Sequence, residues 1–238
     1  MSSLCSFCKS TPSLLHSCIC GQVSYCGKDC QKSDWNSHKP DCPPFITKDI
    51  PGKGRGLIAT RNLSFGCNVL TERPVLVVAI REPDYDKLLS DFLSKSKETQ
   101  RRILNLYDRY HHQEVNEDLS NEKDLVAKLV GIVATNGIVY EYDSDKSEEF
   151  GEEATQKVYL KASLLNHDCR PNVTWYTLPA GGTIVVNVLR PVAKGAELTV
   201  SYVGDEACST RNQRKEKLVP FLFDCKCNIC KEVLHYIP

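Results

Sequence analysis

The sequence lacks both net charge and long apolar runs, and each absence argues against a class of protein. Its 238 residues carry 30 Lys and Arg against 30 Asp and Glu, so no overall charge draws the chain to nucleic acid or to an anionic membrane surface. The longest apolar runs, such as residues 75–80, are far too short to span a bilayer. The first residues show neither the basic stretch nor the apolar core of a secretory signal. We therefore expect a soluble intracellular protein, in the nucleus, the cytoplasm or both, with no membrane partner and no direct binding of nucleic acid.

The overall composition is that of a globular protein. The chain is 41% hydrophobic and 25% charged, which argues against a disordered or fibrous chain. No internal repeat is visible. A length of 238 residues fits one medium domain with a small module attached.

Cysteine is the one residue type whose number is unusually high, and its distribution is clustered. Of 13 cysteines, seven fall between Cys5 and Cys42. Four more are divided between Cys169 and the stretch 225–230. Disulfides do not persist in a reducing compartment, so close-spaced cysteines there indicate metal ligands.

Hydrophobic periodicity divides the chain into three parts. Residues 5–42 cannot bury enough apolar surface to fold without a metal. Residues 46–203 read as a β-rich domain with a helical insertion over about 85–135, broken near 94–97, with its tyrosines facing the core. Strands are predicted at 68–71, 75–80, 157–160, 173–177, 183–188 and 197–201. Residues 204–238 begin with a basic helix from about 211, and the acidic stretch 141–153 predicts a solvated loop.

The N-terminal segment holds eight cysteine and histidine side chains in close pairs: Cys5, Cys8, Cys18, Cys20, Cys26, Cys30, His38 and Cys42. Pairs at this spacing close tight loops, and thiolate with imidazole suits Zn²⁺. The segment therefore predicts two tetrahedral zinc sites. With four protein ligands and no open position, such sites maintain shape and do no chemistry.

The residues between these ligands resemble those of the MYND zinc finger. They are Tyr25-Cys26, Cys30-Gln31-Lys32, Trp35 and His38-Lys39. The resemblance implies interleaved pairs, with Cys5, Cys8, Cys26 and Cys30 on one zinc and Cys18, Cys20, His38 and Cys42 on the other. The family's third and fourth ligands usually lie three residues apart, whereas Cys18 and Cys20 lie two apart. His16 therefore stays open as a substitute for Cys18.

A second cysteine framework lies in the tail, where Cys225, Cys227 and Cys230 supply three ligands. A closed tetrahedral site needs a fourth. Cys169 is the first candidate, and Cys208 is its rival. We expect three structural zinc ions in all.

Cys169 lies inside one of three motifs that occur together. These are residues 164–172 (Leu-Leu-Asn-His-Asp-Cys-Arg-Pro-Asn), residues 197–202 (Glu-Leu-Thr-Val-Ser-Tyr) and residues 52–56 (Gly-Lys-Gly-Arg-Gly). The glycine-rich turn leads into a strand rather than a helix, so it is not a dinucleotide fingerprint. Together and in this order, the motifs resemble a SET-domain protein lysine methyltransferase over about residues 46–230. With the finger attached, the chain is similar to the SET and MYND domain family, with the finger ahead of the SET domain as in fungal relatives.

The resemblance implies a role for each motif. It assigns binding of S-adenosylmethionine to Gly54, Arg55, Gly56, Asn136, Asn166, His167, Tyr202 and Phe223. Tyr202 is also the implied catalytic residue. Phe221 and Phe223 would line the channel for the substrate lysine, and Phe221 stands where many members carry a second tyrosine. The third zinc would fasten the tail to the cofactor motif through Cys169.

The expected architecture is α+β: a β-rich SET domain of short strands with a helical insertion, an N-terminal zinc finger and a C-terminal zinc segment. The expected function is methylation of a lysine in a protein substrate, with histone and non-histone lysines equally compatible. The alternative is a catalytically quiet adaptor whose finger binds a partner, typically a proline-rich peptide in this family. Asn166, His167 and Tyr202 favour the enzyme, whereas Phe221 favours the adaptor.

Overall fold

The computed structural model describes residues 4–18, 23–39, 42–110, 121–140, 154–178, 181–204 and 210–231. Two cysteines named above, Cys20 and Cys208, lie outside these ranges, as does the acidic stretch 141–153. The structure therefore does not bear on the predictions made for them.

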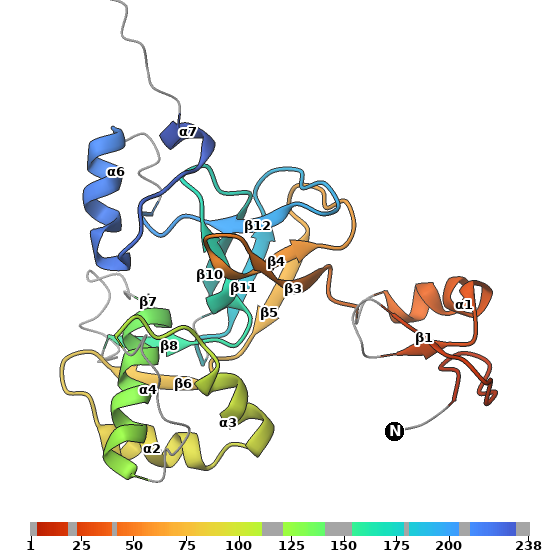
Figure 1. The fold of residues 1–238 in the computed structure, drawn as a ribbon, viewed down its shortest axis with the longest axis horizontal. Helices are drawn as coiled ribbons and strands as arrows, with labels where there is room; N and C mark the ends of the chain where they lie inside the picture. Colours follow the sequence, from red (N-terminus) through yellow and green to blue (C-terminus); the bar gives the residue numbers. More distant parts are fainter. Residues whose placement is uncertain are drawn as a thin grey trace, which may run out of the picture.

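The N-terminal segment forms a small unit to the right of the other elements in Figure 1. It consists of a two-stranded antiparallel sheet and one helix: β1 (His16–Ser17), β2 (Ser24–Tyr25) and α1 (Lys28–His38). Tyr25 is buried and donates a hydrogen bond from its hydroxyl to Asp34 of α1 at 2.8 Å. Apart from Tyr25, the buried apolar positions of this unit are cysteines, so its core is built around sulfur.

One four-stranded sheet joins the motifs recognised in the sequence. Its strands, in spatial order, are β3 (Phe45–Ile50), β4 (Gly54–Ala59), β12 (Glu197–Val200) and β9 (Asn166–His167). The β3–β4 hairpin turns at Gly52 and Gly54, whose φ angles of 74° and 71° favour glycine. Strand β12 pairs antiparallel with β4 and parallel with β9. Strand β12 therefore has the glycine-rich hairpin on one side and the residue pair Asn166–His167 on the other.

Two further sheets of three strands complete the β-rich part. The first has the order β10 (Val173–Thr177), β11 (Ile184–Val188) and β5 (Asn68–Glu72); the second has β6 (Leu76–Ala79), β8 (Thr155–Val158) and β7 (Ile138–Tyr140). The strand prediction at 173–177 matches β10, because its apolar residues alternate and a hairpin follows. The largest core cluster lies between the four-stranded sheet and the sheet of β10, β11 and β5. It includes Leu57, Val186 and Leu198, each fully buried.

In its described residues the insertion forms three helices over the sheet of β6 and β8, and they are drawn in the lower part of Figure 1. They are α2 (Tyr85–Leu93), α3 (Lys97–Leu104) and α4 (Glu122–Asn136). The side chains of Asp84, Ser96 and Asn121 cap these helices, and each accepts a hydrogen bond from a backbone N–H of the first turn. Ser96 explains the predicted break near 94–97, because a serine cap starts a new helix there.

The prediction that the tyrosines of this insertion face the core is wrong. Tyr85, Tyr107 and Tyr110 are 45%, 53% and 58% exposed. The helix ends at Leu104, so the last two tyrosines fall in a loop where the helical period no longer determines their direction. Tyr110 instead lies against the guanidinium of Arg109, 4.8 Å from ring centre to Cζ.

The tail consists of α6 (Arg211–Leu218), the 3₁₀ turn η2 (Val219–Phe221) and α7 (Asn228–Lys231). A reciprocal pair of hydrogen bonds between Thr210 and Gln213 caps α6. The mixed α+β class predicted from the sequence is confirmed. None of the helices in the described ranges is long and apolar enough to cross a bilayer.

Candidate functional site

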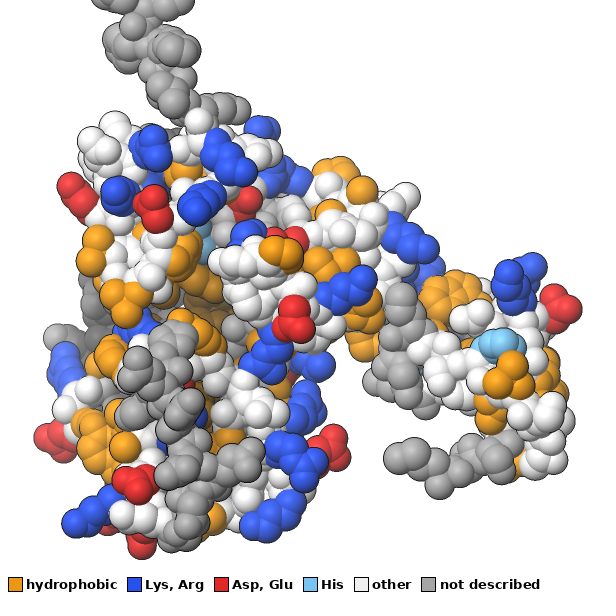
Figure 2. Space-filling view, viewed as in Figure 1, with side chains coloured by type: hydrophobic (Ala, Val, Ile, Leu, Met, Phe, Trp, Pro, Cys, Tyr) orange, Lys and Arg blue, Asp and Glu red, His pale blue; other side chains and the backbone are white. Residues whose placement is uncertain are grey.

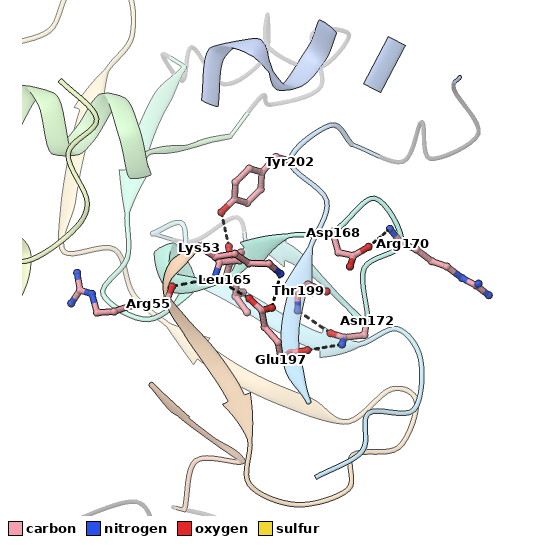
Figure 3. A network of polar contacts seen from close by, with 10 residues as sticks. Lys53, Arg55, Leu165, Asp168, Arg170, Asn172, Glu197, Thr199 and Tyr202 are labelled. Atoms are coloured by element: carbon pink, nitrogen blue, oxygen red, sulfur yellow. Dashed lines mark hydrogen bonds and ion pairs between the residues drawn. The ribbon is translucent and has the colours of Figure 1, made fainter. Parts of the chain in front are cut away.

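Asn166 connects the glycine-rich turn to strand β12. Its side-chain amide donates to the Arg55 carbonyl at 3.2 Å and to Glu197 Oε1 at 2.9 Å. The other carboxylate oxygen of Glu197 forms an ion pair with Lys53 at 2.7 Å. Figure 3 shows this network around Glu197. Three motifs that lie far apart in the sequence therefore share one hydrogen-bonded cluster.

The two glycines that bracket Arg55 differ in their surroundings. A Cβ atom at Gly54 would meet no heavy atom within 4 Å, so the backbone there is open to an approaching ligand. A Cβ at Gly56 would lie 2.3 Å from Ile50 Cδ1 and 2.8 Å from Asn166 Nδ2. Only glycine fits at position 56, because a side chain there would collide with Ile50 and with Asn166, against which the turn packs.

Tyr202 lies two residues after the end of β12 and is held at both ends. Its hydroxyl donates to the Leu165 carbonyl at 2.8 Å, and its backbone N–H donates to His167 Nδ1 at 3.0 Å. Burial, with a smaller contribution from the charge of Glu197, raises the pKa of Tyr202 to about 12. The hydroxyl therefore stays protonated over the physiological range and can act as a hydrogen-bond donor or acceptor.

The tail brings two phenylalanine rings against Tyr202 and His167. The ring centroids of Tyr202 and Phe221 are 4.8 Å apart, and Phe223 lies edge-on to Tyr202 at 6.3 Å. Phe223 also approaches the His167 ring at 5.9 Å. Phe223 is nonetheless 41% exposed, so the aromatic group opens to the surface on one side. The structure thus brings Tyr202, His167, Phe221 and Phe223 together.

Asn136, at the end of α4, is placed less directly. Its side-chain amide donates to the carbonyls of Tyr107 (2.6 Å) and Ile132 (2.8 Å). Its own carbonyl accepts a hydrogen bond from Ser163 Oγ at 3.3 Å, three residues before Asn166. The side chain of Asn136 is therefore occupied with the insertion, and its backbone is linked to the motif.

The cysteines, with His38, form three groups. Within each group the ligand atoms all lie within 4.8 Å of one another. The groups are Cys5, Cys8, Cys26 and Cys30; Cys18, His38 and Cys42; and Cys169, Cys225, Cys227 and Cys230. This is the grouping that the MYND resemblance and the tail motif implied, with Cys20 outside the described residues. His16 belongs to none of these groups, and it is exposed.

The spacing of the sulfurs fits zinc. In a tetrahedron with Zn–S bonds of about 2.3 Å, neighbouring sulfurs lie about 3.8 Å apart. The sulfur separations run from 3.3 Å for Cys26–Cys30 and 3.5 Å for Cys169–Cys230 to 3.7 Å for Cys8–Cys26, 3.8 Å for Cys169–Cys225 and 3.9 Å for Cys18–Cys42. A disulfide would need about 2.05 Å. These clusters therefore have the geometry of metal sites.

The electrostatics of the clusters also favour a cation. Burial raises the pKa of Cys169, and hydrogen bonding with Cys230 raises it further. In the finger, the neighbouring thiol of Cys26, followed by burial, raises the pKa of Cys30 to about 12. Crowded thiols cannot all ionise without a positive charge among them, so binding of a metal must displace protons.

One partly buried carboxylate was not anticipated from the sequence. Both carboxylate oxygens of Glu72 accept backbone N–H bonds from residues 160–162, each at 3.0 Å. Burial raises the pKa of Glu72, while these N–H groups lower it. Glu72 thereby positions the 3₁₀ turn η1 (Ala162–Leu164) just ahead of Asn166. The only sequence signal was that Glu72 is the one acid in the stretch 68–80.

Comparisons with known proteins match both parts of the chain. The model of the SET domain matches residues 54–203, and the model of the MYND finger matches residues 5–42. The "Histone-lysine N-methyltransferase set5" of Schizosaccharomyces pombe is 25% identical over 76% of this chain and 48% of its own length. A "SET and MYND domain-containing protein" of Dictyostelium discoideum is 24% identical over 89% of this chain and 46% of its own. The "N-lysine methyltransferase SMYD2-B" of Xenopus laevis is 24% identical over 95% of this chain and 50% of its own. The chain thus spans about half the length of these curated relatives.

Proposed function

Since the chain belongs to the SET-domain family and carries a MYND finger ahead of that domain, we propose that it is an S-adenosylmethionine-dependent protein lysine N-methyltransferase. The observation that carries the proposal is the meeting of His167 and Tyr202 with the rings of Phe221 and Phe223, while Asn166, next to His167 in strand β9, binds the glycine-rich turn. Relatives named for methylation of histone lysines and of protein lysines support the same activity.

The residues around the glycine-rich turn fit the proposed cofactor. Its amino-acid and adenine parts would be held by the open backbone at Gly54, by Arg55 and Gly56, and by Asn166 and His167. Asn136 would contribute from the end of α4, and Phe223 would cover the cofactor from the tail. When bound, S-adenosylmethionine supplies a methyl group already activated on a sulfonium.

The aromatic group addresses the protonation of the substrate. A lysine with a pKa of about 10.4 is neutral in only about one molecule in a thousand near pH 7.4. The apolar surfaces of Phe221 and Phe223 disfavour the charged ammonium and so lower its pKa. Tyr202, with its hydroxyl protonated, orients the amine by hydrogen bonding and is not a strong base. Phe221 offers no second hydroxyl, so Tyr202 acts there without that partner.

Three structural zinc ions complete the proposal. The two finger groups, with Cys20 in the second, would each hold one ion. The third would join Cys169, next to His167, to the tail that carries Phe221 and Phe223. We expect none of these ions to take part in catalysis, because four protein ligands leave no open coordination position.

An adaptor remains the second candidate, and the finger supplies the observation that favours it. Leu4, Phe7 and Leu14 are 41%, 46% and 64% exposed, so the finger presents apolar side chains to a partner. A proline-rich peptide is the occupant the family resemblance implies. For either function we propose a protein of the nucleus, the cytoplasm or both.

The two candidates are separated by titrating zinc-loaded protein with S-adenosylhomocysteine in a calorimeter. Binding supports the enzyme, and its absence overturns it in favour of the adaptor. On a lysine peptide, Tyr202→Phe should lower kcat by about 100-fold, because the amine loses its orienting hydrogen bond, while S-adenosylhomocysteine still binds. Tyr176→Phe, at an exposed tyrosine of β10, is the matched control and should leave kcat unchanged.

A further inference from the structure

Arg214 is the buried charge of helix α6. Its side chain is only 5% exposed, whereas the neighbouring basic residues Arg211, Lys215 and Lys217 are exposed. Figure 2 shows Lys and Arg side chains gathered at the upper left, over α6. Burying a guanidinium is costly unless an anion meets it. The position of Arg214 therefore needs a negative partner.

That partner is the C-terminal cysteine group. Arg214 Nη2 donates to Cys230 Sγ at 3.7 Å, and the guanidinium also interacts with Cys169. Both cysteines are themselves buried. Neutral thiols would be poor acceptors for a buried cation, whereas four thiolates on Zn²⁺ carry a net charge of about −2.

We propose that Arg214 is a positioning residue of the C-terminal zinc site, where its guanidinium offsets the negative charge of the four thiolates and holds α6 against the cluster. This rests on the third zinc of the proposed function and not on methyl transfer itself. The first finger group provides a contrast, since among the contacts of the described residues no arginine or lysine donates to Cys5, Cys8, Cys26 or Cys30.

The consequence concerns the segment between α6 and Cys225, which carries Phe221 and Phe223. One end of this segment follows α6, which Arg214 fastens to Cys230. The other end is Cys225, whose sulfur lies 3.8 Å from that of Cys169. Both ends are thus tied to the same cluster. Leu222, between the two phenylalanines, adopts a left-handed conformation (φ 58°) that turns the segment back. Arg214 thereby helps to hold the aromatic side of the site closed.

The test is the rate at which a chelator removes zinc from the full-length protein. In Arg214→Met, one of three zinc ions should leave about 10 to 100 times faster, the usual effect of losing a hydrogen-bond partner of a metal ligand. The ions of the finger should leave at the wild-type rate. Lys215→Met removes an exposed positive charge from the next position and should change nothing. Cys225→Ser identifies the affected ion, because that variant should lack it. An unchanged release rate in Arg214→Met overturns the proposal.

A spectroscopic measurement distinguishes charge compensation from simple packing. In protein loaded with Co²⁺, the thiolate-to-metal charge-transfer band should move to longer wavelength in Arg214→Met, because the sulfur lone pairs lose a stabilising cation. The band should stay in place in Lys215→Met. Faster release with an unmoved band would mean that Arg214 only packs, and would overturn the proposal.

Arg214→Lys decides the question if Arg214→Met does not fold. Lysine keeps the charge but loses the fork-shaped donor, so release should be faster by a smaller factor, about 3- to 10-fold. Zinc release from Arg214→Lys that is about 100-fold or more faster than in the wild type would refute the proposal, because a retained positive charge would then give the site no protection. Because none of these measurements uses methyl transfer, the role of Arg214 can hold even if the protein proves to be an adaptor.

Discussion

The finger and the C-terminal cysteine group differ in how far apart in the sequence their ligands lie. In the finger, every described ligand lies between residues 5 and 42, so metal binding would fold one short segment. In the C-terminal group, Cys169 and Cys225 are 56 residues apart, and β10 to β12 and α6 lie between them. Metal binding to a local cluster would stabilise one small module of the chain. Metal binding to the C-terminal cluster would instead fix the tail onto the motif around Cys169, elsewhere in the fold.

The neighbours of the two clusters differ accordingly. Trp35 and Tyr25 pack against finger cysteines, and they supply a core to a unit that has little else. The C-terminal group instead contacts His167, whose Nε2 lies 3.2 Å from Cys169 Sγ. Since His167 Nδ1 accepts the backbone N–H of Tyr202, a short path of contacts joins this cluster to Tyr202.

The largest effect is expected from breaking the C-terminal cysteine group, and breaking a finger group provides the comparison. Cys225→Ser should lower kcat/KM on a lysine peptide by at least about 100-fold, because the tail with Phe223 is released from the site. Cys8→Ser should change kcat/KM by less than about twofold, under about 0.5 kcal/mol of transition-state stabilisation. Zinc content should fall in both variants.

These paired variants can contradict the comparison in either direction. A Cys8→Ser protein as inactive as Cys225→Ser would show that the finger is part of the catalytic unit. A fully active Cys225→Ser would show that the tail needs no metal to close. Calorimetry with S-adenosylhomocysteine, performed on both, reports whether lost activity reflects lost cofactor binding.

The long-range cluster is also the part that the sequence predicted best. Cys225, Cys227 and Cys230 supply three ligands at short spacing, and a tetrahedron needs one more, for which the sequence placed Cys169 ahead of its rival Cys208. The β10–β11 hairpin was predictable for a similar reason, since Gly181 and Gly182 lie at its turn between alternating residues. Both features could be predicted because the spacing of residues in a short stretch of sequence is enough to indicate them.

Other features depended on contacts that no spacing reveals. Arg214 reads as one more cation of a basic helix, and only its packing against Cys230 shows that it is buried. Gly56 meets Asn166, which is 110 positions away, so the need for glycine there is invisible locally. Tyr107 continued a helical period, but the helix had already ended at Leu104.

The dependence of kcat/KM on pH tests the role of Tyr202 and compares the site with the finger. Because the pKa of Tyr202 is raised to about 12, its hydroxyl remains protonated up to strongly alkaline pH. The substrate lysine is charged below its own pKa, so the neutral fraction grows about tenfold per pH unit between pH 7 and 9. The value of kcat/KM should rise with that slope.

The same slope is expected in Cys8→Ser, because the finger lies outside the site, and in Tyr202→Phe at a lower absolute rate. Initial rates on a lysine peptide over this pH range provide the check. A slope that flattens in wild type and reappears in Tyr202→Phe would mean that Tyr202 ionises in this range and acts as the base.

The smallest effect is expected at the contact between the finger and the SET domain. The guanidinium of Arg61 donates to the Cys42 carbonyl at 3.5 Å and lies 5.9 Å from the ring centre of Trp35. Such a partly exposed contact contributes about 0.5–1 kcal/mol. Arg61→Met should therefore lower the melting temperature by only about 2–4 °C. It should leave kcat/KM unchanged, as should Arg73→Met at an exposed arginine between β5 and β6. Calorimetric melting and peptide kinetics measure both. A loss of activity in Arg61→Met alone would show that the position of the finger is transmitted to the site, and the local cluster would then share the task of the long-range one.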